Sequence, residues 1–274
     1  MKKNAIVGQS GGPTAVINAS LYGVVYEALN REDVIGTIYG MINGIEGFLN
    51  ENLMDMKPLE VNGELELIKT TPGSYLGSCR YKLPEDLTDA VYPQLFEKFE
   101  KYNIGYFFYI GGNDSMDTVS KLSRYAETVN SEIHFIGIPK TIDNDLFGTD
   151  HCPGYASAAK YIATSCMEVS KDCRVYDNGT ITVIEIMGRH AGWLAGSAAL
   201  ATYCGSGPDL VYLPEVDFDM ERFFADVHRV YEQKNSVLIA VSEGIHYADG
   251  SFVSEAKASA TDGFGHAQLG GLAA

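Results

Sequence analysis

The chain has 274 residues, a formal net charge of −16 and a hydrophobic content of 46%. This length allows two domains of ordinary size or one large one, and the apolar content suffices for a buried core. The negative charge argues against nucleic acid or an anionic membrane surface as a partner, and no apolar run is long enough to span a bilayer.

Apolar runs alternate with amphipathic stretches along almost the whole chain. Strands are predicted over residues 4–8, 34–39, 104–110, 133–138, 180–186, 210–213 and 237–242. Helices are predicted over residues 14–29, 84–102 (with Pro84 in the first turn), 115–128, 155–174, 190–203 and 220–232, while residues 46–75 are less regular. Strands that alternate with crossover helices predict parallel sheets covered on both faces, and therefore an α/β fold.

The segment Pro139–Asp145 (PKTIDND) follows the predicted strand 133–138 and concentrates one cation and two carboxylates. Pro139 cannot donate to a strand ladder and favours the end of the strand. In α/β proteins, ligands bind at the carboxyl ends of strands. A carboxylate held there can accept a proton while Lys140 holds an anion beside it, which suits phosphoryl transfer to a hydroxyl. A polar loop after a buried strand is the alternative that this segment alone leaves open.

Three glycine-rich turns follow predicted strands, and each can present backbone N–H groups to an anion. They are Gly8–Pro13 (GQSGGP), Ile110–Ser115 (IGGNDS) and Met187–Trp193 (MGRHAGW). The first is neither a G-x-G-x-x-G fingerprint nor a Walker A loop. Each turn also has a structural interpretation. A tight strand-to-helix turn needs glycine in any case. Asp114 and Ser115 are suitable residues for a helix N-cap, and Arg189 could form an ion pair at the surface.

Together and in this order, the motifs resemble the phosphofructokinase family over essentially the whole chain. They are SGG (Ser10–Gly12), GS-x-R (Gly77, Ser78, Arg80), GGNDS (Gly111–Ser115), PKTIDND (Pro139–Asp145), MGR (Met187–Arg189), PE (Pro214, Glu215) and SEG (Ser242–Gly244). The resemblance implies two doubly wound, three-layer α/β/α domains with mainly parallel sheets. It implies that residues 1–139 bind the phosphoryl donor, that residues 140–255 bind a sugar phosphate, and that residues 256–274 begin a segment returning to the first domain.

The resemblance also implies phosphorylation of the 1-hydroxyl of fructose 6-phosphate. Asp143 would be the general base, with Asp145 orienting or tuning it, and Lys140 and Arg189 would stabilise transition-state charge. The backbone amides of Gly11 and Gly12 would hold the donor, helped by Arg80, with Lys82 as a second candidate. Thr141 would contact the sugar or the transferring group. The other matching positions would contact the sugar, namely Met187, Gly188 and Glu243.

Two positions resemble the pyrophosphate-dependent branch of the family. Asp114 and Lys140 stand where ATP-using relatives have glycine. A carboxylate at Asp114 would repel the α-phosphate of a nucleotide, and an ammonium at Lys140 would stabilise the charge of a compact pyrophosphate. An ATP-dependent enzyme and a catalytically silent regulatory subunit are the alternatives. Intact Asp143, Asp145, Lys140 and Arg189 argue against the silent subunit.

The resemblance implies Mg²⁺ as cofactor and a homo-oligomer, either a dimer or a tetramer. Asn113 stands where many relatives have a metal-binding Asp. An amide oxygen can ligate Mg²⁺ but adds no charge, so direct ligation by Asn113, ligation by Asp114 and contact through water all remain open. Tyr22 and Tyr26 stand where allosteric ATP-using relatives carry effector-binding Arg, so we expect no nucleotide effector site of that type.

Relatives continue beyond the residues that end this sequence, and that further segment supplies His and Arg for the sugar 6-phosphate. We therefore expect a truncated chain that keeps the donor site and the base and is impaired in sugar-phosphate binding.

The five cysteines contain no C-x-x-C pair, which argues for reduced thiols and against a structural zinc site. Because the start, Met1-Lys2-Lys3, is not followed by a signal-peptide apolar region, we expect a cytoplasmic protein.

Overall fold

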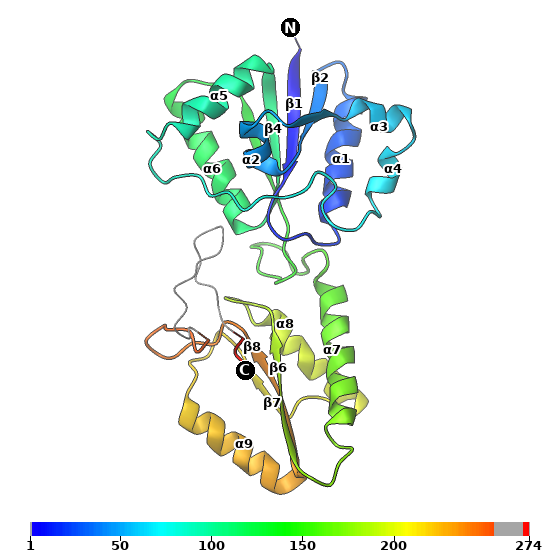
Figure 1. Ribbon diagram of the computed structural model, residues 1–274, viewed down its shortest axis with the longest axis vertical. Helices are drawn as coiled ribbons and strands as arrows, with labels where there is room; N and C mark the ends of the chain where they lie inside the picture. Colours follow the sequence, from blue (N-terminus) through cyan, green and yellow to red (C-terminus); the bar gives the residue numbers. More distant parts are fainter. Residues whose placement is uncertain (1, 255–270, 274) are drawn as a thin grey trace. The chain divides into compact units, whose positions relative to one another are not determined.

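The computed structural model describes residues 2–254 and 271–273, which belong to two compact units, Met1–Thr141 and Ile142–Ala274 (Figure 1). Each unit has its own sheet with mainly parallel pairing and its own helices, which confirms the predicted α/β class. The boundary follows Thr141, whereas the sequence suggested a boundary after residue 139. The predicted returning segment, residues 256–274, lies outside the described residues except for 271–273.

The first unit contains a five-stranded sheet in the order β3-β2-β1-β4-β5. Its strands are β1 (Lys3–Gln9), β2 (Ile35–Met41), β3 (Leu53–Asp55), β4 (Ile104–Gly111) and β5 (His134–Pro139). All pairs are parallel except β2 with β3. The chain runs from β1 outward to β2 and β3, and then resumes on the other side of β1 with β4. The topological switch point therefore lies between the carboxyl ends of β1 and β4, which is where open α/β sheets bind ligands.

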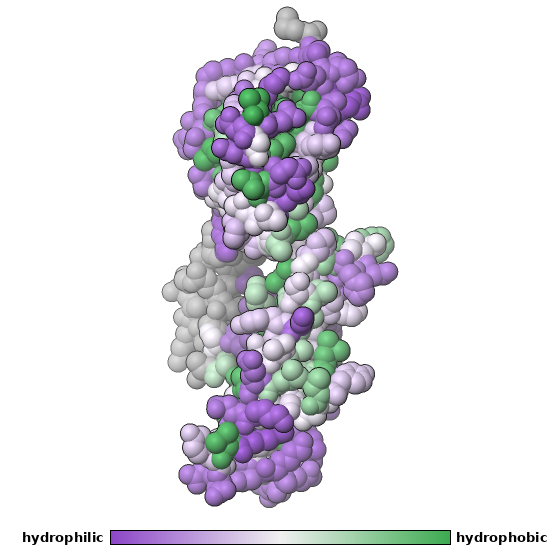
Figure 2. All heavy atoms as spheres, turned by 90° about the vertical axis from the view of Figure 1, so that its right-hand side faces the viewer, coloured by the Kyte–Doolittle hydropathy of each residue, from purple (hydrophilic) through white to green (hydrophobic). Residues whose placement is uncertain are grey.

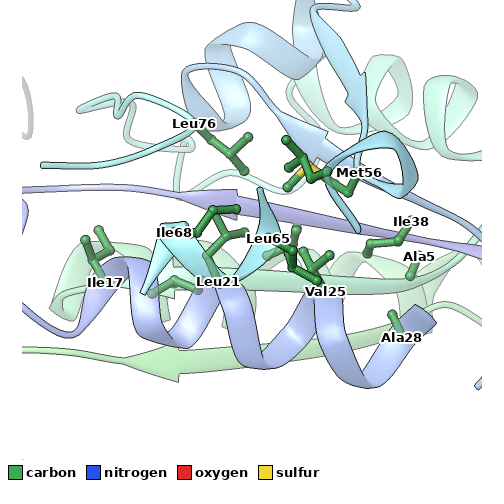
Figure 3. Packing of buried hydrophobic residues seen from close by; sticks show 13 residues of the cluster. Ala5, Ile17, Leu21, Val25, Ala28, Ile38, Met56, Leu65, Ile68 and Leu76 are labelled. Atoms are coloured by element: carbon green, nitrogen blue, oxygen red, sulfur yellow. The ribbon is translucent and has the colours of Figure 1, made fainter. Parts of the chain in front are cut away.

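Helices cover both faces of this sheet. They are α1 (Ile17–Asn30), α2 (Gly44–Leu49), α3 (Lys57–Val61), α4 (Leu65–Ile68), α5 (Val91–Lys101) and α6 (Asn113–Thr128). On one face, the apolar side chains of α1 pack with those of α3, α4 and β1 (Figure 3). On the other face, α2, α5 and α6 cover an aromatic core in which the rings of Phe99 and Phe107 lie 5.6 Å apart. The two clusters form the layers on either side of the sheet.

The second unit has a parallel three-stranded sheet in the order β6-β8-β7, with β6 (Thr180–Ile186), β7 (Leu210–Tyr212) and β8 (Ser236–Ser242). Its helices are α7 (Tyr155–Asp172), α8 (Trp193–Ser197), a 3₁₀ helix (Ala198–Cys204) and α9 (Met220–Lys234). Ala240 of β8 packs toward α7 and α8, whereas Val237 and Ile239 pack toward α9. This alternation with a period of two gives three layers (Figure 1).

The helices predicted over 14–29, 84–102 and 190–203 all begin too early, and α1 starts at Ile17. The helix predicted from Pro84 begins only at Val91, because the carboxylates of Asp86 and Asp89 accept hydrogen bonds from the backbone N–H groups of Thr88 and Val91, both at 2.9 Å. Such local side-chain bonds favour turns over helix. The helix predicted over 190–203 begins at Trp193 and changes to 3₁₀ geometry after Ser197.

Hydrophilic residues cover much of the face of the first unit seen in Figure 2, with hydrophobic residues scattered between them. Across residues 2–254 and 271–273, no helix combines the length and the apolar character needed to cross a bilayer.

Candidate active site

The first glycine turn lies at the switch point of the first sheet. Ser10 N donates to Ile110 O at 2.9 Å, which ties the end of β1 to the end of β4. A Cβ built on Gly11 would lie 3.7 Å from Nζ of Lys140, so the ammonium of this buried lysine sits close to the turn. Gly12 is exposed, and a Cβ there would meet no atom within 4 Å. The turn thus offers an accessible backbone beside a cation, and both features favour the binding of an anion.

The second glycine turn adjoins the first. Gly111 O accepts from Lys140 N at 2.9 Å, which joins the ends of β4 and β5. Gly111 must be glycine, because a Cβ would lie 1.9 Å from Ser115 Oγ and 3.1 Å from Ser10 O. The N-cap of α6 is Gly112, so neither Asp114 nor Ser115 takes the capping position considered in the structural interpretation. The half-buried Asp114 lies in the first turn of α6.

An irregular segment, residues 71–85, lies against the first turn, and we call it the strap. Ser78 Oγ donates to Gly11 O at 2.6 Å, and Gly11 N donates to Cys79 O at 3.2 Å. The next residue is Arg80, which is exposed. The strap therefore places Arg80, a predicted donor-binding residue, directly after a residue that bonds Gly11.

Two buried amides, which the sequence analysis missed, hold the first part of the strap. Gln9 Nε2 donates to Asn18 Oδ1 at 2.9 Å, and Gln9 Oε1 accepts a hydrogen bond from Leu76 N at 2.9 Å. Asn18 Nδ2 donates to Thr71 O at 2.7 Å. Gln9 and Asn18 are nearly fully buried, so both depend on these partners. The only local signal was a polar pair inside otherwise apolar elements.

Tyr109 of β4 contacts the strap through its hydroxyl group. Its hydroxyl lies 3.5 Å from Cys79 Sγ and accepts from Ile45 N at 3.4 Å. Burial raises the pKa of Tyr109 well above its ordinary value, because the phenolate form would lose its hydration. The side chain therefore stays neutral and acts as a structural support of the strap.

The segment Pro139–Asp145 spans the boundary between the two units. Lys140 and Thr141 belong to the first unit, and Asp143 and Asp145 belong to the second. Asn144 between them is buried, and it organises the loop that follows by donating to Asp150 O at 3.1 Å and accepting from Cys152 N at 2.8 Å. Asp143 is half-buried and Asp145 is exposed on either side of this anchor.

In the second unit, predicted sugar-binding residues gather at the carboxyl ends of β6 and β8. Gly188 N donates to Glu243 Oε1 at 3.1 Å, and Glu243 N donates to Ile186 O at 2.9 Å. Ser242 Oγ donates to Gly188 O at 2.5 Å. Glu243 is therefore held in place at both its backbone and its carboxylate.

Met187 and Arg189 flank Gly188 at the same edge. Met187 is 59% exposed, so its side chain is available to a ligand. A Cβ on Gly244 would lie 1.9 Å from Arg189 O, so the two loops touch through their backbones. The structure thus brings together Met187, Gly188, Arg189 and Glu243, whose roles in binding and catalysis stay predictions from the family resemblance.

Within residues 2–254 and 271–273, no three His, Cys, Asp or Glu side chains converge as a ready metal-ligand group. Mg²⁺ commonly takes one or two carboxylates and completes its shell with substrate phosphates and waters. The start of α6 offers one carboxylate, Asp114, and one exposed amide, Asn113, next to the glycine turns. This donor set fits a Mg²⁺ ion that binds together with a phosphate ligand.

Comparisons with known proteins identify relatives of this chain. The phosphofructokinase family profile matches residues 4–274. A pyrophosphate--fructose 6-phosphate 1-phosphotransferase of Halomonas elongata is 44% identical over 98% of this chain, and its namesake in Xanthomonas campestris is 46% identical over 98%. A crystal structure of a pyrophosphate-dependent phosphofructokinase from Nitrosospira multiformis covers 92% of this chain with a TM-score of 0.79 and 42% identity.

The chain spans only part of these relatives, namely 65% of the Halomonas protein, 64% of the Xanthomonas protein and 63% of the Nitrosospira chain. The family profile nevertheless matches almost every residue, and the motif residues occupy the strand ends where such sites form. The chain therefore belongs to the phosphofructokinase family.

Proposed function

We propose that the protein transfers a phosphoryl group from pyrophosphate to the 1-hydroxyl of fructose 6-phosphate, giving fructose 1,6-bisphosphate and phosphate. The observation that carries the proposal is the Lys140 ammonium beside Gly11, with Asp114 opening α6 at the same switch point. Pyrophosphate lacks the adenosine contacts of ATP, so its affinity must come from charge and backbone donors. A buried cation next to an open glycine turn supplies both.

We propose that the first unit binds pyrophosphate and the second binds the sugar phosphate. Gly12 and Arg80 would hold the donor, because the turn and the strap lie together at the end of β1. The N–H of Gly11, which was expected to share this role, is bonded to Cys79 O at 3.2 Å, so Gly11 would act by joining the turn to the strap. Asp114 would disfavour a nucleotide through repulsion of its α-phosphate.

The transfer requires a base for the sugar hydroxyl and positive charge around the moving phosphoryl group. Asp143 would accept the 1-hydroxyl proton, and Asp145 would orient it. Lys140 and Arg189 would stabilise the charge that develops on the phosphoryl oxygens, and Thr141 would hydrogen-bond the transferring group. In the reverse direction, Asp143 would return the proton.

The sugar would rest on the carboxyl edge of the second sheet. Glu243 is fixed by its bond to Gly188 N and can accept hydrogen bonds from sugar hydroxyls through its other oxygen. Met187 would cover the apolar part of the sugar. Mg²⁺, held with the help of Asp114 or Asn113, would neutralise charge on the donor when bound.

Three further features belong to this proposal. We expect a homo-oligomer, either a dimer or a tetramer. Tyr22 and Tyr26 stack on each other at 5.5 Å between ring centroids, and Tyr22 also bonds Glu66, which supports the expectation of an enzyme without a nucleotide effector site there. All five cysteines are free thiols, which supports a reducing, cytoplasmic location.

The test is a coupled assay of phosphoryl transfer to fructose 6-phosphate, run with pyrophosphate and with ATP, both with Mg²⁺. Turnover with pyrophosphate alone, abolished by Asp143→Ala while calorimetric binding of pyrophosphate persists, would support the proposal. Turnover with ATP alone would favour the ATP-dependent alternative. Binding of fructose 6-phosphate without turnover on either donor would favour a silent regulatory subunit.

A further inference from the structure

Lys121 of α6 is a buried lysine that the proposed chemistry does not use. Its side chain is 1% exposed, and its Nζ makes three polar contacts. It donates to Asp117 Oδ2 on the same helix at 2.6 Å. It also donates to Leu83 O at 3.1 Å and to Glu85 Oε1 at 2.7 Å. Two of its three partners therefore belong to the strap, far from α6 in sequence.

A buried ammonium is costly unless its donors are satisfied. Lysine has three N–H donors, and Lys121 has three acceptors, two of them carboxylates. Burial alone would lower the pKa of Lys121, but the hydrogen bonds with Asp117 and Glu85 outweigh it and raise the pKa. The residue is thus a charged clamp between α6 and the strap.

Several polar contacts hold the strap along its length, and this clamp is among them. The Gln9–Asn18 pair holds residues 71–76. Gly11 bonds residues 78 and 79. Lys121 bonds residues 83 and 85.

Arg80 lies between the contacts of Gly11 and those of Lys121, in a stretch without helix or strand. Regular structure does not fix this part of the backbone, so its path depends on the contacts on either side of it. Before it are the bonds to Gly11, and after it are the Lys121 clamp, the buried side chain of Leu83 and the hydrogen bond from the Tyr92 hydroxyl to Pro84 O.

We propose that Lys121 is a positioning residue of the donor site: by clamping the strap to α6 it keeps Arg80 beside the Ser10–Gly12 turn, where pyrophosphate binds. The inference rests on the proposed function, because it assigns Lys121 an effect on the affinity for pyrophosphate. Lys121 acts through Arg80 and does not itself contact the substrate. The same clamp links the strap to the helix whose first turn carries Asp114.

The test is a double-mutant cycle between Lys121→Met and Arg80→Met, with pyrophosphate binding in the presence of Mg²⁺ measured by titration calorimetry. If Lys121 acts through Arg80, Lys121→Met weakens binding on the order of tenfold when Arg80 is present, since small displacements of a binding group are costly. The same change has little effect in the Arg80→Met background, because coupled residues are not additive. Lys121→Arg, which keeps the charge, recovers most of the affinity.

A matched control is Lys98→Met. Lys98 is also largely buried and bonds a carboxylate, Glu51, at 3.0 Å, but it lies on α5 and does not touch the strap. Its replacement leaves the affinity for pyrophosphate unchanged. If Lys121→Met loses its circular-dichroism signature of the fold, Glu85→Ala replaces it in the cycle, because Glu85 is 76% exposed.

Two outcomes would overturn the inference while the proposed function stands. One is unchanged pyrophosphate affinity in folded Lys121→Met, and the other is an equal loss with and without Arg80, which would mark a purely structural role. Absence of pyrophosphate binding by the unaltered protein would instead overturn the proposed donor, and the role of Lys121 with it.

Discussion

In the proposed function, the choice between pyrophosphate and ATP depends on Asp114. It lies in the first turn of α6, half-buried, at the switch point of the first sheet. A negative side chain is favourable at a helix N-terminus, so Asp114 is stable there without any ligand. The same negative charge would repel the α-phosphate of a nucleotide. Pyrophosphate has no phosphate group at that position.

Asp114→Gly is expected to lower turnover with pyrophosphate and to introduce measurable turnover with ATP. Removing the carboxylate removes both its volume and its repulsion of the nucleotide α-phosphate. Initial rates with the two donors at saturating fructose 6-phosphate measure the change. Asp114→Asn keeps the volume without the charge and shows which of the two matters. Strict pyrophosphate use by both variants would contradict this explanation of donor choice.

Gly244 allows its loop to lie directly against the backbone of Arg189. A Cβ here would lie 1.9 Å from Arg189 O and 2.6 Å from its Cα, so alanine must displace the backbone that carries Arg189. We expect Gly244→Ala to reduce kcat by roughly 10²-fold, because a misplaced charge-stabilising group acts mainly on the transition state. Calorimetric binding of pyrophosphate should change little.

The matched control for this prediction is Gly196→Ala in α8, where the nearest neighbouring atom to a Cβ would be 3.9 Å away. It should leave kcat unchanged. A Gly244→Ala variant that folds and turns over normally would show that the position of Arg189 tolerates the shift or does not matter.

Between α2 and α5, one carboxylate joins several elements. Glu51 accepts hydrogen bonds from Lys101, from Lys98 at 3.0 Å and from the hydroxyl of Tyr102 at 2.9 Å. The Lys101 ammonium first, and then Lys98 and Tyr102, lower the pKa of Glu51 from 4.5 to about 2. The charged carboxylate therefore contributes to the packing of α5 against the end of α2.

This depressed pKa predicts how the contribution varies with pH. The stabilisation is fully present above the unfolded-state pKa of 4.5 and is lost as the pH falls toward about 2. We expect Glu51→Gln to destabilise the protein at pH 7 and the difference from the unaltered protein to shrink between pH 5 and pH 3, as measured by urea unfolding. Glu60→Gln, at an exposed residue of α3, is the control. A pH-independent difference would show that the charge of Glu51 is not the cause.

The sequence predicted the longer elements well, for identifiable reasons. Strands such as β4 and β8 are short apolar runs buried on both faces, so their pattern is strong. The helix start at Val91 was missed because Asp86 and Asp89 bond nearby backbone groups, a local effect that competes with helix propensity. The antiparallel strand β3 is only three residues long and carries almost no periodic signal.

The site was predicted unevenly. The glycine turns were found because they follow strong strands, and parallel strands deliver their carboxyl ends to one edge. The Gln9–Asn18 pair and the Lys121 clamp were not found, since their partners on the strap lie 36 to 67 residues away in the sequence. Single polar residues in apolar elements indicate that a partner exists, but they do not identify it.

At the scale of the whole molecule, each unit has its own apolar core. The first has a cluster on each face of its sheet, and the clusters of the second use residues of that unit. Compact units with separate cores can fold separately. The residues proposed for the donor site all belong to the first unit, namely Gly11, Gly12, Arg80, Asp114 and Lys140.

A fragment of residues 1–141 should therefore unfold cooperatively and bind pyrophosphate with Mg²⁺ in titration calorimetry. A fragment of residues 1–139 keeps the sheet but loses Lys140, whose ammonium lies beside Gly11. We expect it to fold and to bind pyrophosphate at least about tenfold more weakly, since a hydrogen bond to a charged group contributes roughly 1.5–3 kcal/mol. Equal affinities would exclude Lys140 from the donor site. Failure of the longer fragment to unfold cooperatively would mean that the first unit depends on the second for its stability.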